Sequence, residues 1–488
     1  MAEAYRTIPV RPSQWPGLVV MLREDDEYAI NTNNNFGLAS AGGVYGRLAD
    51  CAACIFRANG LGPLSKWVDD HIFFRIRCEY LSSYNLQRQQ WHQTIMANGG
   101  QKQRGSRLWY EGEMLPDGSL AEFDEDASCA FSDLSARSPR PLHDASFTYS
   151  DADIDALSEH LGIPWEPTKT VPFGEEVPYL GFIWNLATRS VSIPEGKKTK
   201  YLNAIQEWSA RRTHTLNDVE KLYGKLLHAS MVIPEGRAYL TSLESMLGTF
   251  SNNSFATHHP HRDSSTELAW WSNTLASPYL GREIPGPRPV TDRAAFSDAS
   301  SGIGIGIVIQ GKWRAWCLIP GWKCDGRDIG WAEAVGFEFL VYTLSTVLEP
   351  GEHFRVYGDN RGVVEEWWKG RSRNKRTNEV FRRIHTFLRD RNCTVITRYV
   401  PSKDNPADDP SRGKYPSHQH LLPAIPIPVE LQEFIIDFDK PLLPAELELK
   451  RRGNAPTPLD KPQPHPNRGE PGHSWDEYLE FVAQTKEE

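Results

Sequence analysis

The chain has 488 residues, of which 39% are hydrophobic and 11% aromatic, and its formal net charge is −9. This length exceeds what a single hydrophobic core supports, so the composition predicts a multidomain protein with large packed cores. There is no run of about 18 apolar residues and no signal-peptide pattern, which excludes a membrane-spanning or secreted protein. Seven scattered cysteines indicate a reduced, intracellular compartment, either cytoplasm or nucleus.

Residues 1–83 are predicted to form one compact unit of the α+β type. Apolar runs alternate with turn residues, and a helical stretch over about residues 40–59 is followed by an apolar hairpin. Asp69 and Asp70 lie at the tip of this hairpin. A plain turn is the simpler interpretation, but two adjacent acids between such apolar strands favour a metal-binding pair.

Residues 84–170 are polar and acidic, and they predict a partly disordered insertion. The acids Asp151, Asp153 and Asp155 have the spacing of a calcium loop. Such a loop needs Gly and Glu where this chain has Ala156 and Gly162, so a capped helix start is favoured.

Residues 171–250 are predicted to form strands followed by amphipathic helices, and the His- and Pro-rich residues 251–290 a connector. The next unit, residues 291–413, is predicted to have the order β-β-β-α-β-α-α-β-α. This order corresponds to a mixed sheet with helices on both faces, so the fold class of the whole chain is α/β and multidomain. The Pro-rich, charged residues 414–488 predict a largely disordered tail.

Four carboxylates fall on the elements of residues 291–413 that could bring them together. Asp298 ends the first strand, Glu333 lies in the first turns of the long helix, Asp359 follows the fourth strand, and Asp408 follows the last. A single acid of this kind is usually a turn or cap residue. Two divalent ions about 4 Å apart need several converging carboxylates, so the set predicts a two-metal site for phosphodiester chemistry.

In this order the four acids resemble the Asp, Glu, Asp, Asp set of the ribonuclease H domain of retroelement polymerases. The most specific match is Asn405-Pro406-Ala407-Asp408, followed after two residues by Ser411-Arg412. It implies that Asp408, and not Asp404 or Asp409, is the fourth ligand, and the family pattern favours Glu333 over Glu338. The resemblance implies hydrolysis of RNA in RNA/DNA hybrids with two Mg²⁺ ions, or Mn²⁺ in their place.

Residues 1–250 resemble retrotransposon reverse transcriptases, with the tyrosine-recombinase class nearest. The segment Trp67-Val68-Asp69-Asp70 is similar to the Tyr-x-Asp-Asp motif, with Trp67 in place of Tyr, which implies that Asp69 and Asp70 are catalytic metal ligands. Phe36 and Gly37 lie in a segment similar to the template-contacting motif, although Asn35 and Gly42 stand where Pro is common. Residues 179–184 are similar to the primer-gripping hairpin, and residues 197–250 would be the thumb.

The start of the chain departs from the family. Residues 1–5 match only the part of the first catalytic motif that comes after its Asp, with Tyr5 at the position that senses the incoming sugar. The resemblance therefore implies the C-terminal part of a polymerase, without its fingers and its first catalytic Asp. Such a chain is expected not to polymerise alone, and an intact polymerase subunit is a candidate partner.

Nucleic acid is the expected partner, as an RNA/DNA hybrid or a template–primer. Residues 369–398 contain ten basic residues against two acidic ones, a local balance of +8. Such a run is often only a solvated face, but beside a carboxylate site it favours phosphate contacts. The predicted basic contacts are Lys197, Lys198, Lys200, Arg371, Arg373, Lys375 and Arg376.

Two other functions stay open from the sequence. The chain could be a non-catalytic nucleic-acid-binding remnant, which would bind hybrid without cleaving it. It could also be a DNA transposase or integrase of the same fold, although such an enzyme needs neither the hairpin with Asp69 and Asp70 nor the segment similar to the primer grip.

Overall fold

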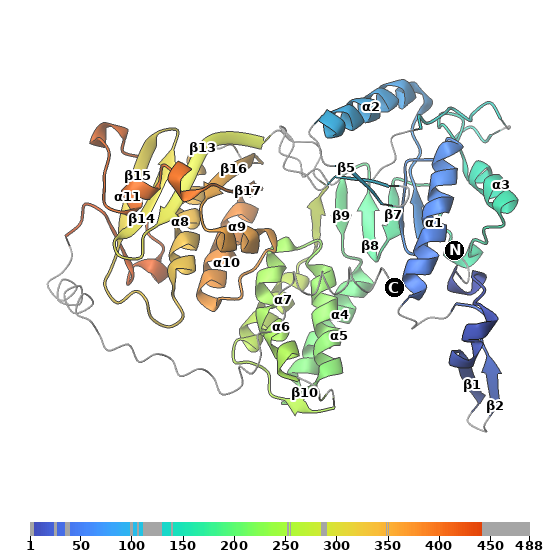
Figure 1. Ribbon diagram of the computed structural model, residues 1–488, viewed down its shortest axis with the longest axis horizontal. Helices are drawn as coiled ribbons and strands as arrows, with labels where there is room; N and C mark the ends of the chain where they lie inside the picture. The colour runs from blue at the N-terminus through green and yellow to red at the C-terminus, as the bar shows by residue number, and fades with distance from the viewer. Residues whose placement is uncertain are drawn as a thin grey trace.

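The structure is a computed structural model that describes residues 4–23, 27–34, 40–97, 101–104, 107–110, 129–137, 140–250, 253, 255–284, 290–347, 349 and 351–441. Figure 1 shows three groups of elements in chain order: an N-terminal α/β unit, a small sheet with a helical bundle, and a C-terminal α/β unit. Within the described part of the chain, no helix is long and apolar enough to cross a membrane.

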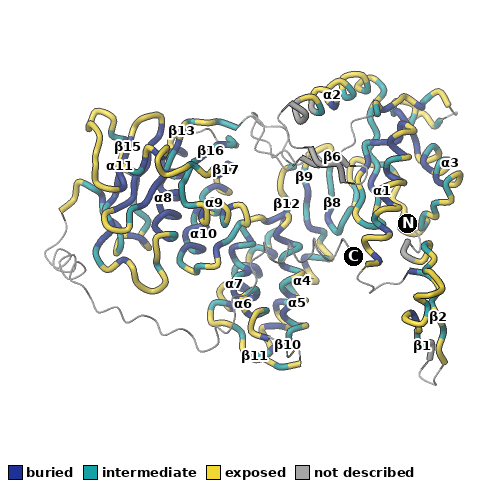
Figure 2. Tube along the Cα trace, viewed as in Figure 1, coloured by how far each residue is buried: buried dark blue, intermediate teal, exposed yellow. Residues whose placement is uncertain are grey.

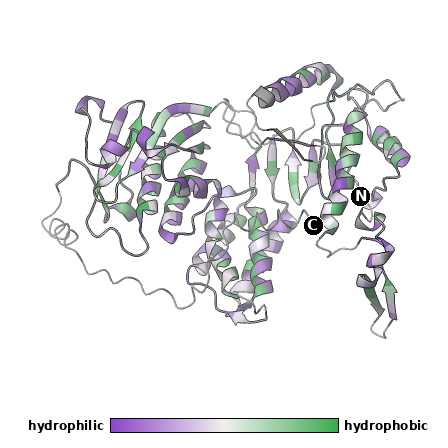
Figure 3. Cartoon of the chain, viewed as in Figure 1, coloured by the Kyte–Doolittle hydropathy of each residue, from purple (hydrophilic) through white to green (hydrophobic). Residues whose placement is uncertain are grey.

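The N-terminal unit is built around helix α1 and the hairpin that follows it. Phe56 of α1 packs edge-on against Phe73 of the hairpin, with ring centroids 5.3 Å apart. The predicted helix and hairpin are therefore confirmed, while α2 lies apart from this core and is largely hydrophilic (Figure 3). The elements are β1 (Val19–Arg23), β2 (Glu27–Ile30), α1 (Ala41–Ala58), β3 (Leu64–Trp67), β4 (Asp70–Phe73), α2 (Leu81–Ala97), β5 (Gln101–Arg104), β6 (Arg107–Tyr110) and α3 (Asp151–Leu161).

Residues 129–170 differ from the prediction of a partly disordered insertion, because they complete the core of this unit. Leu134, Tyr149 and Ile154 are buried against α1, and the Tyr149 hydroxyl donates to the Phe74 carbonyl at 2.6 Å. α3 begins with a capping box between Ser150 and its third residue, as the capped-helix interpretation predicts. The acidic residues 111–128 lie outside the described residues.

The middle unit joins a four-stranded sheet of order β12-β9-β8-β7 to a helical bundle. Trp271 and Leu275 of α7 are fully buried in the bundle core, so the described part of residues 251–290, predicted as a connector, contributes a helix and the two short strands β11 and β12. The elements are β7 (Glu176–Tyr179), β8 (Phe182–Asn185), β9 (Ser190–Ser192), α4 (Glu195–Ser209), β10 (His214–Thr215), α5 (Leu216–Ala229), α6 (Thr241–Leu247), β11 (Thr257–His258), α7 (Ser264–Leu275) and β12 (Gly281–Glu283).

The C-terminal unit is a mixed six-stranded sheet of order β17-β16-β13-β14-β15-β18. β13 pairs in parallel with β16 and antiparallel with β14, so it lies at the centre of the sheet. The predicted order of elements is confirmed through the last helix. The elements are β13 (Val290–Ala299), β14 (Gly304–Ile309), β15 (Lys312–Leu318), α8 (Ile329–Leu344), β16 (His353–Gly358), α9 (Arg361–Trp368), α10 (Lys375–Asp390), β17 (Thr394–Tyr399), α11 (Asp408–Ser411) and β18 (Ile435–Asp437).

Helices cover both faces of this sheet, as predicted for the α/β class. In β14, Ile305 and Ile307 pack in the core that α8 and α10 cover, whereas Val308 faces Ala407 beside α11. Every residue of β14 is buried in consequence. α8 is buried along most of its length because it lies between the sheet and α10 (Figure 2).

Residues 414–441 are ordered and belong to this unit, which corrects the prediction of a disordered tail for that part. β18 pairs antiparallel with β15. The buried Arg314 donates two hydrogen bonds to the Asp437 carboxylate, at 2.7 and 2.9 Å, and one to the Leu422 carbonyl at 2.8 Å. Residues 442–488 lie outside the described residues.

Candidate metal centre

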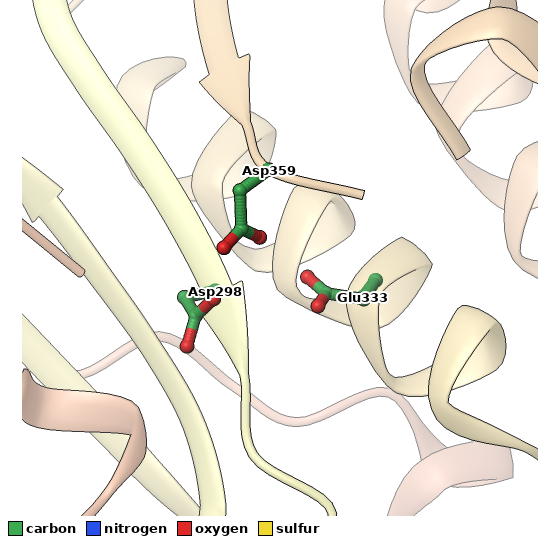
Figure 4. A group of neighbouring side chains, drawn as sticks. All are labelled: Asp298, Glu333 and Asp359. Carbon is green, nitrogen blue, oxygen red and sulfur yellow. The ribbon is translucent and has the colours of Figure 1, made fainter. Parts of the chain in front are cut away.

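Three of the four predicted carboxylates converge at one edge of the C-terminal sheet. The parallel register pairs Ser297 with Gly358, so Asp298 in β13 and Asp359 directly after β16 lie on neighbouring strands. Glu333 reaches them from α8. One carboxylate oxygen of each residue lies within 4.8 Å of the others, and Figure 4 shows the three side chains pointing toward one another.

The local sequence places Glu333 at this edge. The Asp328 carboxylate caps α8 by accepting a hydrogen bond from the Trp331 amide at 3.0 Å, which fixes where the helix begins. Further along α8, a Cβ added at Gly336 would lie 3.2 Å from Ile305 Cγ2 of the sheet. A residue without a side chain at this position therefore lets α8 approach β14 closely, and the same packing of α8 on the sheet brings Glu333 near the two aspartates.

Burial and the charges of neighbouring acids raise the pKa of Asp298 and of Glu333 above the usual carboxyl range. Burial raises the pKa of Asp298 to about 7, with further contributions from the charges of Asp359 and Asp408, while a hydrogen bond from Ser411 acts in the opposite direction. Burial also raises the pKa of Glu333, and the charges of Asp298 and Asp359 add to it. A cation at this edge would relieve the repulsion and release protons.

Asp408, the fourth predicted ligand, lies next to this cluster without being part of it. Its carboxylate accepts a hydrogen bond from Arg412 Nε at 2.8 Å, and it begins the short helix α11. Its charge still acts on Asp298. The structure thus brings Asp298, Glu333 and Asp359 together and leaves Asp408 adjacent, held by an arginine.

The chemistry of the donor set fits a hard divalent cation. Asp298, Glu333 and Asp359 offer only carboxylate oxygens, and no His or Cys belongs to this cluster among the described residues. Oxygen-only ligand sets suit Mg²⁺ and Mn²⁺ and disfavour softer metals. These residues, with Asp408 beside them, would hold the ions.

The competing acids have other partners. Glu338 is completely buried and accepts two hydrogen bonds of 2.7 Å from Arg383, so it forms an ion pair on the side of α8 that faces α10. Asp409 is paired with Lys414 at 3.1 Å. Glu338 is therefore engaged by Arg383, whereas Asp408 and Asp409 are each paired with a basic residue, so the choice of Asp408 as fourth ligand stays a prediction.

The acids predicted in the N-terminal unit form no comparable cluster. Asp69 is half-buried and Asp70 exposed at the tip of the β3–β4 hairpin, where Asp70 pairs with Trp67. Within the described residues, neither belongs to a group of three metal-ligating side chains. Phe36, Gly37 and the side chain of Tyr5 lie outside the described residues.

The three predicted lysines of α4 have different environments. Lys198 is buried, and its Nζ donates to Glu195 at 2.7 Å and to the Ser277 carbonyl at 2.8 Å, so it ties α4 to the end of α7. Half-buried Lys197 lies against Gly181, where an added Cβ would clash with its Nζ. Lys200 is exposed and lines a polar groove of about 430 Å³.

Most of the predicted basic contacts in residues 369–398 are engaged by the bundle or by neighbouring acids. Arg371 pairs with Glu244, and Lys375 pairs with Asp263 at 2.9 Å. Arg376 pairs with Asp325 and, at 3.0 Å, with Glu379. Arg373 is exposed, with no ion-pair partner among the residues that the structure describes.

The sequence analysis did not single out Arg382 of α10, which makes several of the hydrogen bonds between α10 and the helical bundle. It donates to the Ala238 carbonyl at 2.7 and 2.8 Å and pairs with the buried Glu267 at 2.5 Å. The basic run therefore fastens the C-terminal unit to the bundle, and no local signal in the sequence shows that its partners lie more than 100 residues away.

A second set of residues flanks the acids and was also missed. Arg361 begins α9, two positions after Asp359, and its guanidinium lies 4.8 Å from the ring centroid of the exposed Tyr399. Ser411 of α11 is completely buried and donates a hydrogen bond to the Asp298 carboxylate. The only signal for Ser411 in the sequence is its place in the segment Asn405-Pro406-Ala407-Asp408, followed after two residues by Ser411-Arg412.

No protein-family model and no curated protein matches the sequence. Solved structures with distant similarity include the foamy viral protease-reverse transcriptase bound to an RNA/DNA hybrid, with a TM-score of 0.33 and 12% identity over 82% of this chain and 44% of that one. The same viral protein bound to double-stranded DNA gives a TM-score of 0.33 and 12% identity over 82% of this chain and 67% of that one. A further form of it with double-stranded DNA gives 0.30 and 10%, and there the chain spans 56% of the other protein's length.

Proposed function

We propose that the C-terminal unit cleaves the RNA strand of RNA/DNA hybrids, in a chain of the retroelement reverse transcriptase and ribonuclease H type. The observation that carries the proposal is the convergence of Asp298, Glu333 and Asp359 from three separate elements, with Asp408 beside them. Two bound Mg²⁺ ions would neutralise charge on the scissile phosphate and activate a water molecule. Asp298, Glu333, Asp359 and Asp408 would hold these ions.

The side chains around the acids are suited to a nucleic-acid backbone. Arg361 and Tyr399 give the edge of the sheet a positive charge and an exposed aromatic face beside Asp359. Arginine binds phosphate oxygens, and a hybrid is recognised mainly through its backbone and 2′-hydroxyl groups. We assign the hybrid contact to this edge, with Lys200 of the bundle as a more distant phosphate contact.

The first experiment tests cleavage and its specificity. Purified protein is incubated in Mg²⁺ with labelled RNA/DNA hybrid, duplex RNA and duplex DNA, and compared with Asp298→Asn. The matched control is Asp292→Asn, which lies on the same strand but bonds to Tyr357 and Arg355 away from the cluster. Cleavage of hybrid alone, lost in Asp298→Asn and kept in Asp292→Asn, is the expected result.

Other outcomes identify the alternatives. Binding of hybrid without cleavage, unchanged by Asp298→Asn, would identify a non-catalytic nucleic-acid-binding remnant. Cleavage of duplex DNA would place the chain with the transposases and integrases of the same fold. Either result contradicts the proposed activity.

A second experiment tests the nucleic-acid contact. Arg361→Ala is compared with Lys312→Ala, an exposed lysine at the far end of β14 and β15, and hybrid affinity is measured over a range of salt concentrations. Loss of one phosphate contact lowers the slope of log affinity against log salt by about 1. Equal slopes for the two variants would refute the assignment of Arg361.

The N-terminal and middle units, by this proposal, hold a template–primer, with Asp69 and Asp70 as candidate ligands of a polymerase metal. Their support is the residue pattern at the tip of a confirmed hairpin. Primer extension by the full chain, compared with Asp69→Asn, tests this part. No incorporation is expected from the chain alone, so incorporation that Asp69→Asn removes would contradict that expectation and assign Asp69 to an active polymerase site, whereas incorporation that is identical in both would rule out a role of Asp69.

A further inference from the structure

The short helix α11 lies directly on the sheet next to Asp298. Gly306 of β14 is the cross-strand partner of Asp298 in the antiparallel register. A Cβ added at Gly306 would lie 2.6 Å from the Ser411 amide nitrogen and 2.7 Å from the Ala407 carbonyl oxygen. Both atoms belong to the backbone and cannot move aside as a flexible side chain could, so this approach requires a glycine at that position.

This approach delivers a hydroxyl group to a proposed metal ligand. Ser411 is completely buried, and its Oγ donates a hydrogen bond to Asp298 Oδ2. The same Oγ lies 2.9 Å from the Asp408 carbonyl. A serine hydroxyl can donate only one hydrogen bond at a time, and an ionised carboxylate is a stronger acceptor than a backbone carbonyl. When Asp298 is charged, the Ser411 hydroxyl therefore donates to the Asp298 carboxylate and not to the Asp408 carbonyl.

The loop before α11 is fixed to the same strand. The Asn405 side chain donates to the Ser297 carbonyl at 3.0 Å and accepts from the Ala407 amide at 3.1 Å. Asn405 is itself buried. Two contacts therefore fix the position of Ser411 relative to Asp298: the close approach of α11 to Gly306 of β14, and the hydrogen bonds of Asn405 in the loop before α11.

We propose that Ser411 is a positioning residue for Asp298, and that the contact between Gly306 and α11 places its hydroxyl. Asp298 and Asp359 repel each other when both are charged, and an unrestrained Asp298 would rotate away from the cluster. The hydrogen bond from Ser411 restrains one carboxylate oxygen and leaves the other available to a cation. This inference rests on the proposed metal site, because it concerns how that site is organised before an ion arrives.

The test measures Mg²⁺ binding by calorimetry in the full chain without nucleic acid. Ser411→Ala removes the hydroxyl, and Ser411→Cys keeps a weak donor of similar size. Removal of a group that orients a metal ligand weakens metal binding by about 10–100-fold, so the Mg²⁺ affinity of Ser411→Ala is expected to fall by a factor in this range. The Mg²⁺ affinity of Ser411→Cys is expected to lie between those of Ser411→Ala and the parent protein.

The matched control is Ser230→Ala. Ser230 is likewise buried at the end of a helix, and its Oγ donates at 2.7 Å to the carbonyl of Leu227, three residues earlier, and not to a carboxylate of the described residues. Its loss is expected to leave Mg²⁺ affinity unchanged. A weakening of Mg²⁺ binding in Ser230→Ala equal to that in Ser411→Ala would overturn the inference, because the effect would then be general destabilisation.

A kinetic readout separates positioning from substrate binding. With Ser411→Ala, the Mg²⁺ concentration needed for half-maximal cleavage is expected to rise about 10-fold or more, while the KM for hybrid at saturating Mg²⁺ stays at the parent value. If Ser411→Ala does not fold, as judged by circular dichroism, the comparison of Ser411→Cys with the parent decides the question.

A failure of this inference can be distinguished from a failure of the proposed function. A parent protein that binds Mg²⁺ and cleaves hybrid, with a Ser411→Ala variant of equal Mg²⁺ affinity, overturns only the role of Ser411. A parent protein that neither binds Mg²⁺ nor cleaves hybrid overturns the proposed function and this inference together.

Discussion

Asp298→Asn is expected to stabilise the metal-free protein while abolishing its cleavage activity. Asp298 is 4% exposed and lies between other acids, and its burial raises its pKa to about 7. At pH 8 the folded protein therefore carries a buried charge that is disfavoured relative to the unfolded chain. Asparagine has nearly the same shape, can still accept the hydrogen bond from Ser411, and carries no charge.

The size and direction of the effect follow from proton linkage. Below pH 4 the folded and unfolded forms both hold the proton, between pH 4 and 7 only the folded form does, and above pH 7 neither does. The stabilising contribution of the protonated carboxyl is thus lost as pH rises to 7. A pKa change from 3.8 to about 7 corresponds to about 4 kcal/mol in all, of which about 3 kcal/mol falls between pH 5 and pH 7.

The assay compares the two proteins by urea-induced unfolding in EDTA, read by hydrogen exchange in peptides from α8. The stability advantage of Asp298→Asn over the parent is expected to grow by about 3 kcal/mol from pH 5 to pH 8. Saturating Mg²⁺ at pH 8 should reduce that advantage, because the ion stabilises only the parent site. An advantage that does not change with pH would refute the reasoning.

Three further predictions concern ion pairs. Arg382→Ala leaves the buried Glu267 unpaired and should weaken docking of α10 on the bundle by about 3–5 kcal/mol, measured as faster hydrogen exchange in residues 234–247. Glu338→Gln breaks the ion pair with Arg383 and should lower the unfolding free energy by about 3 kcal/mol. The Mg²⁺ affinity, measured by calorimetry, should stay unchanged, and weaker Mg²⁺ binding would contradict a purely structural role of Glu338. Asp437→Ala leaves Arg314 buried without its carboxylate and should cost about 3–5 kcal/mol in urea unfolding, whereas no loss would mean that β18 contributes little.

The sequence was most informative where structure is determined locally. The strands and helices of residues 291–413 could be predicted from hydrophobic periodicity. The structure adds their caps, such as Asp328 and Asn360, each of which accepts a hydrogen bond from a backbone amide three residues ahead. The convergence of Asp298 and Asp359 could be expected because parallel neighbouring strands end at the same edge of a sheet, and Glu333 joins them from the first turns of α8. The pairing of Asp408 with Arg412 depends on side-chain geometry that no spacing reveals.

The sequence was least informative where burial depends on contacts between distant segments. Residues 129–165 look polar, and only the packing of Leu134 and Tyr149 on α1 shows that they complete a core. β18 is three residues long, too short for a periodic pattern, and its place in the sheet depends on β15 and on the pair of Arg314 with Asp437. In both segments the stabilising partner lies far away in the sequence, so composition alone favoured disorder.

The basic run of residues 369–398 bears on how a substrate would reach the proposed metal site. Three of its arginines pair with Glu244 and Glu267 of the bundle and with Glu338 of α8, so part of the charge that suggested phosphate binding is neutralised by acids of the protein. The opposite boundary of the acids, formed by Arg361 and Tyr399, stays exposed. Under the proposed function, the net charge of −9 is no obstacle to binding a nucleic acid, because the small positive edge beside the acids would orient its backbone while the paired arginines dock the two units.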